Sequence, residues 1–407
     1  MSTEGYERGK QDIGHAANPS ISDGPRNSTD ELGAIPGSAG RGGAAATAER
    51  TAGGGRGSDG PGNRRGNGRR KKCRAEEMMV PDATFTSYYG RQVVKAAPWE
   101  AAIPLYLFLG GVAGGSSLLG AGADLSGRPQ LRRAARIGAT GAISASLLAL
   151  VYDLGKPTRF INMLRVFKPT SPMSVGTWLI TAYAPGNILA GAAEVAKLLP
   201  VRFGVLSTLL EFAARPAGLA AALIAPGVAS YTAVLLTDTS TPAWHDAHRE
   251  LPFVFVGSAA AASGGFGMLM APVSEAGPAR RLAIAGAIAE LAVEHRMEQS
   301  MGLSAETLHH GKPGRLIRAS KILTAVGATG ALLLGGRSRI AAAVSGVALM
   351  AGSACTRFGV FEAGIESAED PKYTVIPQRE RLNRRRAAEA AARDADADSD
   401  AAADQES

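Results

Sequence analysis

The residues best suited to chemistry stand in a polar connection between two apolar stretches, LLTDTSTPAWHDAHRELPFVF at residues 235–255. This connection brings Asp238, His245 and His248 close together along the chain. A quinone head takes up protons when it is reduced and releases them when the quinol is oxidised, so titratable groups beside an apolar slot favour a quinone site. A zinc site on His245 and His248 is the weaker alternative, because the segment lacks convincing further ligands.

A second charged segment, VYDLGKPTRFINMLRVFKPTSPMSVGTW at residues 151–178, also borders apolar stretches. It joins Asp153, at the expected membrane edge, to Arg159 and several further basic residues. An ordinary basic interfacial loop would explain it about equally well, because such loops record the positive-inside bias. The density of specific residue types favours function, and we include Asp153 and Arg159 in the expected site.

Two acids, Glu290 and Glu294, stand one helical turn apart within an apolar stretch. Carboxylates are costly to bury in a membrane, so this pair is a candidate proton path. The alternative is an interfacial helix with both acids in water, which the shortness of the stretch, residues 282–295, leaves open.

The elements that position these residues follow from apolar length. A bilayer core of roughly 30 Å needs about 20 apolar residues per helix. About eight stretches approach that length: residues 103–123, 137–152, 175–193, 219–236, 253–271, 282–295, 322–334 and 340–358. We therefore expect an all-α integral membrane fold of two four-helix bundles, with 282–295 as the least secure helix. The first stretch carries a doubled GxxxG pattern, which predicts a helix inside the bundle.

The ends of the chain have a different composition from its middle. Residues 1–80 and 378–407 are rich in Gly, Arg, Asp and Ala with few large apolar side chains. Such segments bury too little surface to offset the entropy of ordering. We predict disordered tails around a transmembrane domain over residues 81–377.

Charge and ligand counts limit the function classes. The net charge of +8 is assigned to anionic lipid and the positive-inside bias rather than to nucleic acid. The six histidines stand in a tail, in connections or at a helix end, so a haem held between facing helices is not expected. The two cysteines, Cys73 and Cys355, are too far apart for a cluster, so no iron–sulfur cluster is expected in this chain.

Orientation rests on the basic residues. Lys and Arg are abundant in both tails and in the connections after the second and sixth stretches, which predicts an inner-membrane protein with cytoplasmic termini. The connection after the first stretch, with Arg128, Arg132, Arg133 and Arg136, argues for the reverse.

Several segments carry a family resemblance, namely SYYGRQVVKAAPWE, IPLYLFLGGVAGGSSLL, DLGKPTRFINMLRVFKPTSPMSVGTW, DTSTPAWHDAHRELPFVF and FEAGIESAEDPKYTV. Through them, roughly residues 85–380 resemble the NrfD/PsrC family of polysulfide reductase membrane subunits. The resemblance implies a haem-free subunit of eight helices with a menaquinone site. It also implies two partners, a four-cluster ferredoxin-like iron–sulfur subunit and a molybdopterin catalytic subunit of formate-dehydrogenase-like or polysulfide- or thiosulfate-reductase-like kind.

The resulting hypothesis is a membrane anchor and quinone-reactive subunit that does not bind the primary substrate. The residues expected near the quinone are Tyr106, Asp153, Arg159, Asp238, His245 and His248, with Glu290 and Glu294 on a proton path. A secondary transporter or channel is one alternative, since broken helices and buried acids occur there too. A purely structural anchor without quinone is the other.

Overall fold

The computed structural model describes residues 92–156, 158–200 and 204–406, which all belong to one compact unit, Ala83–Ser407. The described chain is helical, with no strand among these residues. The predicted N-terminal tail, residues 1–80, lies outside the described residues.

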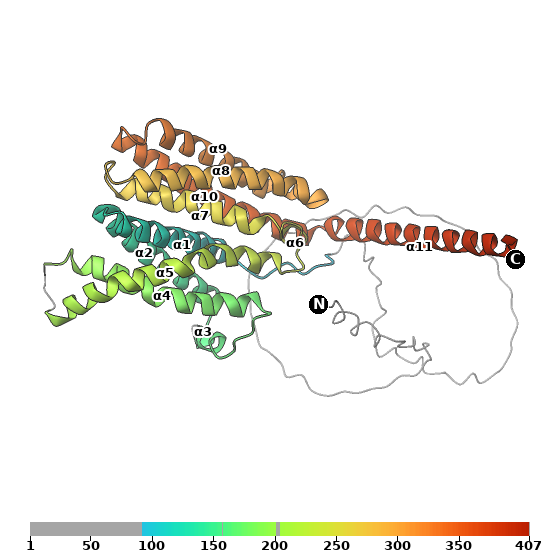
Figure 1. The fold of residues 1–407 in the computed structure, drawn as a ribbon, viewed down its shortest axis with the longest axis horizontal. Helices are drawn as coiled ribbons and strands as arrows, with labels where there is room; N and C mark the ends of the chain where they lie inside the picture. Colours follow the sequence, from blue (N-terminus) through green and yellow to red (C-terminus); the bar gives the residue numbers. More distant parts are fainter. Residues whose placement is uncertain (1–91, 157, 201–203, 407) are drawn as a thin grey trace, which may run out of the picture. The chain divides into compact units, whose positions relative to one another are not determined.

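The first bundle is built from four long helices and one short one (Figure 1). The long helices are α1 (Ala102–Leu125), α2 (Pro129–Asp153), α4 (Pro172–Ala196) and α5 (Val205–Thr237), and the short one is α3 (Thr158–Met163). Both α2 and α4 begin with a proline, whose fixed φ and missing N–H suit the first helical position. Gly127, at φ 65°, supplies the left-handed residue that ends α1.

The second bundle follows in the chain and lies beside the first (Figure 1). Its long helices are α7 (Leu251–Met270), α8 (Gly277–Ser300), α9 (Gly311–Leu333) and α10 (Arg339–Glu369). The short helix α6 (Pro242–Asp246) enters it, and the 3-10 helix η1 (Gly302–Leu308) joins α8 to α9. Successive long helices run in alternate directions, so α1 starts and α10 ends at the same end of the bundles, here called the α6 end.

The predicted all-α membrane fold with two four-helix bundles is confirmed. Six helices, α1, α2, α5, α7, α9 and α10, are long and apolar enough to cross a membrane. The remaining two, α4 and α8, are as long but lack a continuous segment that is apolar enough by the same measure. The stretch we considered least secure, 282–295, is a complete helix of 24 residues, because it extends at both ends into charged positions that apolar length does not count.

Helix α1 lies between the two bundles, as its glycines predict. It contacts α2 and α5 on one side and α7 and α10 on the other. A Cβ on Gly114 would lie 2.9 Å from the carbonyl oxygen of Ala225, and a Cβ on Gly115 would lie 2.9 Å from that of Ala259. Only hydrogen at these positions permits backbones to approach this closely, which is how small residues hold membrane helices together.

Large apolar side chains cover the outer faces of the helices. Leu223 is 84% exposed, Phe212 83% and Ile340 76%. A water-soluble protein would bury such a set, whereas hydrocarbon accepts it. These faces are the lipid-facing surface.

The prediction of a disordered C-terminal tail differs from the structure, which has a helix, α11 (Lys372–Glu406). The reason is local propensity, since the segment is rich in Ala, Arg and Glu, which form helices without burial. Arg385 and Glu389 add an ion pair of 3.5 Å one turn apart. At its start, a hydrogen bond of 3.0 Å to Glu306 raises the pKa of Lys372 and joins α11 to η1.

Candidate functional site

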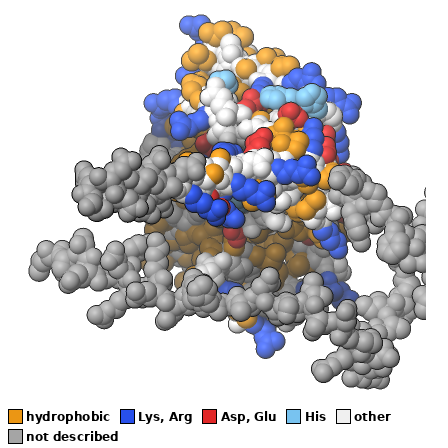
Figure 2. Space-filling view, turned by 90° about the vertical axis from the view of Figure 1, so that its right-hand side faces the viewer, with side chains coloured by type: hydrophobic (Ala, Val, Ile, Leu, Met, Phe, Trp, Pro, Cys, Tyr) orange, Lys and Arg blue, Asp and Glu red, His pale blue; other side chains and the backbone are white. Residues whose placement is uncertain are grey.

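The two charged connections singled out in the sequence, residues 151–178 and 235–255, both lie at the α6 end. The end of α2, the short helix α3, the end of α5 and α6 all lie there (Figure 1). Seen from this side, Lys and Arg, acids and His gather over the end of the bundles (Figure 2). The alternating helix directions produce this, because the connections after the second and fourth long helices must emerge on the same side.

A mainly apolar cavity of about 160 Å³ opens inside the first bundle near this end. It lies among α1, α2, α3, α4 and α5, with Trp99 at its edge. Its apolar walls are Ile103, Leu150, Leu154, Phe160, Met163, Met173, Ile180 and Leu235, and its polar groups are Tyr106, Asp153, Thr177 and Tyr231. The missing side chain of Gly176 makes room for the ring of Tyr231. A cavity of apolar walls with few polar groups is the usual form of a small-molecule site.

Two of the predicted residues, Tyr106 and Asp153, meet at this cavity. Tyr106 is 4% exposed, and its carbonyl oxygen accepts a hydrogen bond of 3.1 Å from Ser146, which fixes α1 against α2. Asp153 is half-buried at the last position of α2. It also lines a separate open hollow with Glu100 and Tyr152. Asp153 therefore stands between the cavity and the surface, where a carboxylate can exchange protons with both.

The other four predicted residues lie at the same end but do not line the cavity. Arg159 is exposed and donates to the carbonyl of Leu154 at 3.2 Å. Asp238 is exposed at the end of α5. The exposed rings of His245 and His248 stack with centroids 5.8 Å apart. The structure thus divides the predicted quinone set into two cavity residues and four surface residues.

Two stacked tryptophans connect the cavity to α6, which carries His245. Trp99 lines the cavity and stacks on Trp244 of α6, with ring centroids 5.8 Å apart. The indole N–H of Trp244 donates to the carbonyl of Val360 at 2.8 Å. Sequence reasoning did not include Trp99, although an aromatic residue just before an apolar stretch is a typical interfacial signal. These contacts fix the exposed α6 segment close to the cavity.

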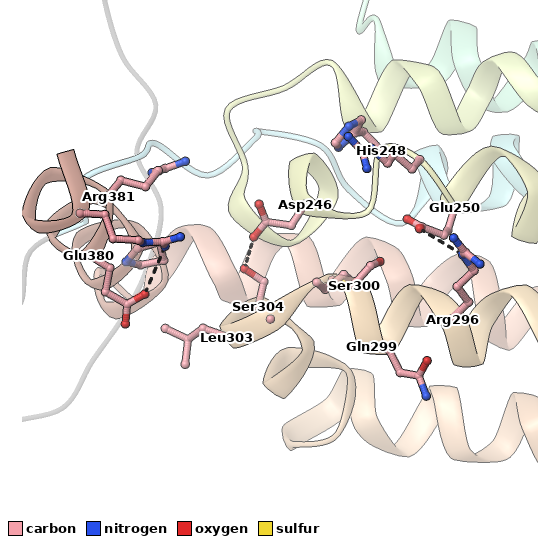
Figure 3. A pocket seen from close by; sticks show the side chains of 15 residues that line it. Asp246, His248, Glu250, Arg296, Gln299, Ser300, Leu303, Ser304, Glu380 and Arg381 are labelled. Atoms are coloured by element: carbon pink, nitrogen blue, oxygen red, sulfur yellow. Dashed lines mark hydrogen bonds and ion pairs between the residues drawn. The ribbon is translucent and has the colours of Figure 1, made fainter. Parts of the chain in front are cut away.

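A larger and more open hollow of about 700 Å³ lies beside α6 (Figure 3). Asp246 accepts a hydrogen bond from Ser304 at 2.5 Å, and Glu250 faces Arg296 at 3.9 Å. His248 and the first turns of α11 complete the lining. Charges of both signs on an open surface are typical of a protein contact rather than of an apolar ligand.

The two acids of the second bundle are buried. Glu290 is 0% and Glu294 1% exposed, so the alternative of solvated interfacial acids is wrong. Thr356 donates to Glu290 at 2.6 Å, and Ser320 lies 2.6 Å from the same hydroxyl. Both carboxylate oxygens of Glu294 lack a hydrogen-bond partner among the described residues. The pair lies on α8, which does not line the cavity.

Sequence reasoning missed a buried ion cluster at the opposite end of the first bundle. We define the ion cluster as Asp124, Arg132, Arg136 and Glu194. Glu194 lies 2.9 Å from Arg132 and 3.3 Å from Arg136, and Arg136 lies 3.4 Å from Asp124. The two arginines had been assigned to a basic loop, but α2 already begins at Pro129. The signal that could have found them is the presence of matching acids, Asp124 and Glu194, directly after the apolar stretches 103–123 and 175–193.

No group of three or more His, Cys, Asp and Glu side chains within the described residues is arranged to hold a metal ion. Cys355 is a free, half-buried thiol on α10. The His245 and His248 pair therefore gains no further ligand from the described part of the chain.

The comparison with known families decides the affiliation. A family model described as the polysulphide reductase NrfD matches residues 91–304. The chain belongs to the NrfD polysulphide reductase family. The matched region runs from before α1 into η1, so it contains every helix that lines the cavity.

A curated relative gives a more local likeness. This relative is the C subunit of polysulfide reductase from Wolinella succinogenes, with 30% identity over 150 residues, or 34% of this protein and 47% of the relative. The protein thus spans about half the length of this relative. NrfD membership and the lipid-facing helices together make this a multi-pass membrane protein.

Proposed function

We propose that this protein is the membrane anchor and quinone-reactive subunit of a molybdopterin and iron–sulfur oxidoreductase complex, with menaquinone or another quinone as its substrate. The observation that carries the proposal is the apolar cavity at the α6 end, with Tyr106 buried inside it and Asp153 between it and the surface. NrfD membership supports the same function.

The residues around the cavity suit a quinone. Phe160, Met163 and Ile180 offer apolar surface to a ring and its isoprenoid tail. Tyr106 is placed to hydrogen-bond a carbonyl oxygen, which apolar walls would otherwise leave without a partner. Asp153 is placed to give a proton to the quinone or take one from it at the edge of the cavity.

The exposed residues of the α6 end support docking of the partners. Arg159, Asp238, His245 and His248 are exposed there, next to the open charged hollow. In this proposal they contact a four-cluster ferredoxin-like iron–sulfur subunit, which carries electrons to or from the molybdopterin subunit. The proximity of the cavity to this face supports the assignment, because electron transfer requires a short distance between cluster and quinone.

The proposal is tested on the complex purified through a tag on this subunit. We expect Ile180→Trp, which fills the cavity, and Asp153→Asn to lower quinone turnover at least tenfold. Tyr152→Phe is the matched control, because Tyr152 is adjacent in sequence but 77% exposed. Wild-type complex without bound quinone and without quinone turnover would reject the proposal and leave a purely structural anchor.

A second candidate function is proton movement through the second bundle, as in a transporter or pump. Glu290 and Glu294 favour it, because acids buried in a membrane are costly and are usually functional, and both carboxylate oxygens of Glu294 lack a hydrogen-bond partner among the described residues. The test is proton flux into liposomes that contain only this chain. Flux that is lost in Glu290→Gln would support transport without partner subunits.

We also propose the inner membrane as the location, with cytoplasmic termini. The even number of long helices supports a common side for the start of α1 and the end of α10. Labelling of an engineered cysteine in α11 by a membrane-impermeant reagent in intact cells tests this, and labelling from outside would reverse the orientation.

A further inference from the structure

A line of polar side chains runs through the middle of the first bundle, where apolar packing would suffice for folding. We define the polar line as Ser117, Thr140, Tyr183 and Asn187. The hydroxyls of Ser117 and Tyr183 are 2.6 Å apart, and Ser117 donates to the amide oxygen of Asn187 at 3.1 Å. Thr140 donates to the carbonyl of Asn187 at 3.0 Å. Three helices, α1, α2 and α4, thus contribute to one connected set.

The polar line begins about one helical turn beyond the cavity wall, and none of its four residues lines the cavity itself. Ile180, on the cavity wall, precedes Tyr183 by about one turn of α4, so both side chains share a face. Tyr183 is 0% exposed and donates to the carbonyl of Ala113 at 2.8 Å. On α1, Ser117 follows Tyr106 by three turns of the same helix. The polar groups therefore continue inward from the cavity.

At its other end the polar line meets the ion cluster. Asn187, Gly191 and Glu194 follow one another on the same face of α4, and Gly191 leaves space into which Thr140 packs. Asp124 of the cluster is also 3.3 Å from Arg215, whose side chain is 65% exposed. From Tyr106 to Asp124 the rise along α1 is roughly 27 Å. The line and the cluster together span most of the membrane, from the cavity to the far surface.

Two buried polar atoms along this route lack a hydrogen-bond partner among the described residues. They are the amide nitrogen of Asn187 and one carboxylate oxygen of Glu194. A buried polar atom without a partner costs about 1–3 kcal/mol, so such sites usually hold water. Polar groups that served only to join the helices would be expected to pair fully with one another. The route has the composition of a hydrated proton path.

We infer that the polar line and the ion cluster conduct protons between the quinone cavity and the membrane face opposite the α6 end. This inference rests on the proposed quinone function. Reduction of one quinone to quinol takes two electrons, supplied by the iron–sulfur partner, and two protons, supplied along this line; oxidation reverses both flows. Electrons and protons then reach the cavity from opposite sides, so turnover moves charge across the membrane.

The test uses the purified complex, with menadione or its quinol as the probe, both in detergent and in sealed liposomes with a voltage-sensitive dye. We expect Asn187→Leu and Tyr183→Phe to lower turnover in detergent about tenfold or to lower the membrane potential per quinone about threefold, with the KM for the probe unchanged. Thr181→Val is the matched control on α4, because its hydroxyl bonds only within the helix, to the carbonyl of Thr177, and both readouts should stay at the wild-type level.

Two outcomes are decisive against the inference. Turnover and potential that both match the Thr181→Val control would show that the line is structural. A wild-type complex that turns over quinone without building a potential would show that the protons come from the α6 end. If Asn187→Leu fails to fold, Ser117→Ala and Thr140→Val remove single hydroxyls at smaller cost and are read in the same way. Absence of quinone turnover in the wild type would instead refute the proposed function.

Discussion

The two bundles have the same number of long helices but use their interiors differently. The first bundle keeps space inside, with the cavity and hydroxyl groups between bulky side chains such as Tyr183 and Tyr231. The second bundle is closed by glycines, and a Cβ on Gly264 would lie 2.6 Å from the carbonyl oxygen of Ala279. It buries two carboxylates, Glu290 and Glu294, in this tight packing.

The difference shows that one membrane bundle can leave room for a ligand while its neighbour packs tightly around two buried acids. A quinone needs room and a few weakly polar groups, since its ring is apolar and only its oxygens need partners. A carboxylate in a tight bundle needs a hydrogen-bond donor, which Thr356 supplies to Glu290. The Thr356 hydroxyl is in turn hydrogen-bonded to that of Ser320. The two interiors therefore fit different tasks, and variants can separate them.

The largest loss of folded protein is expected from a substitution where the two bundles meet. In Gly115→Leu the new side chain would collide with Ser263 and the backbone of Ala259, so α1 cannot stay against α7. We expect loss of folded, membrane-inserted protein, measured by fluorescence size-exclusion chromatography of a fusion. Gly122→Leu is the control, because a Cβ there meets nothing within 4 Å; equal loss in both variants would contradict the close packing.

A smaller loss of stability is expected from a substitution in the ion cluster of the first bundle. Glu194→Ala leaves Asp124 as the only acid of the ion cluster for both Arg132 and Arg136, which should lower the free energy of unfolding by about 3 kcal/mol. Arg133→Ala removes a contact of 3.9 Å from a side chain that is 44% exposed and should cost less than about 1 kcal/mol. Thermal unfolding in detergent measures the loss of stability in each variant. Equal losses in Glu194→Ala and Arg133→Ala would contradict the burial of the ion cluster.

In the second bundle, neutralising Glu294 should not lower the free energy of unfolding, unlike the loss of Glu194 in the first bundle. Glu294→Gln replaces a buried carboxylate, whose oxygens lack a hydrogen-bond partner among the described residues, with a neutral amide, so we expect an unchanged free energy of unfolding or one higher by up to about 1 kcal/mol. Glu290→Ala, which strands the Thr356 hydroxyl, should be destabilising. A strong loss of stability in Glu294→Gln would mean that Glu294 has a partner in the membrane, and would weaken the contrast between the bundles.

The smallest effect on quinone chemistry is expected at the histidines outside the cavity. His245→Ala and His248→Ala should leave the KM for menadione and the turnover per intact complex within about twofold of wild type, since neither residue lines the cavity. Asp153→Asn is the comparison that should lower turnover. The same histidine variants should weaken retention of the iron–sulfur subunit during purification. If His245→Ala alone abolished turnover with the complex intact, the quinone would bind beside α6.

Prediction from sequence succeeded where the signal was local. The apolar stretch of α1 and its glycines were enough to place that helix inside the bundle, because the Gly114 and Gly115 pattern acts over one turn. The extent of α8 was underestimated because its ends are charged. The C-terminal helix α11 was missed because lack of burial was equated with disorder, although Ala, Arg and Glu favour a helix in water.

The sequence by itself determined a helical membrane protein and the regions where its charges emerge, since apolar length and residue type depend only on neighbours in the chain. Only the tertiary structure decided which of those residues share a site. Tyr106 and Asp153 meet at one cavity, while His245 and His248, in the segment that first drew attention, remain outside it. The physical reason is that a side chain's partners depend on how each helix is rotated and which helix lies beside it, and packing alone fixes both.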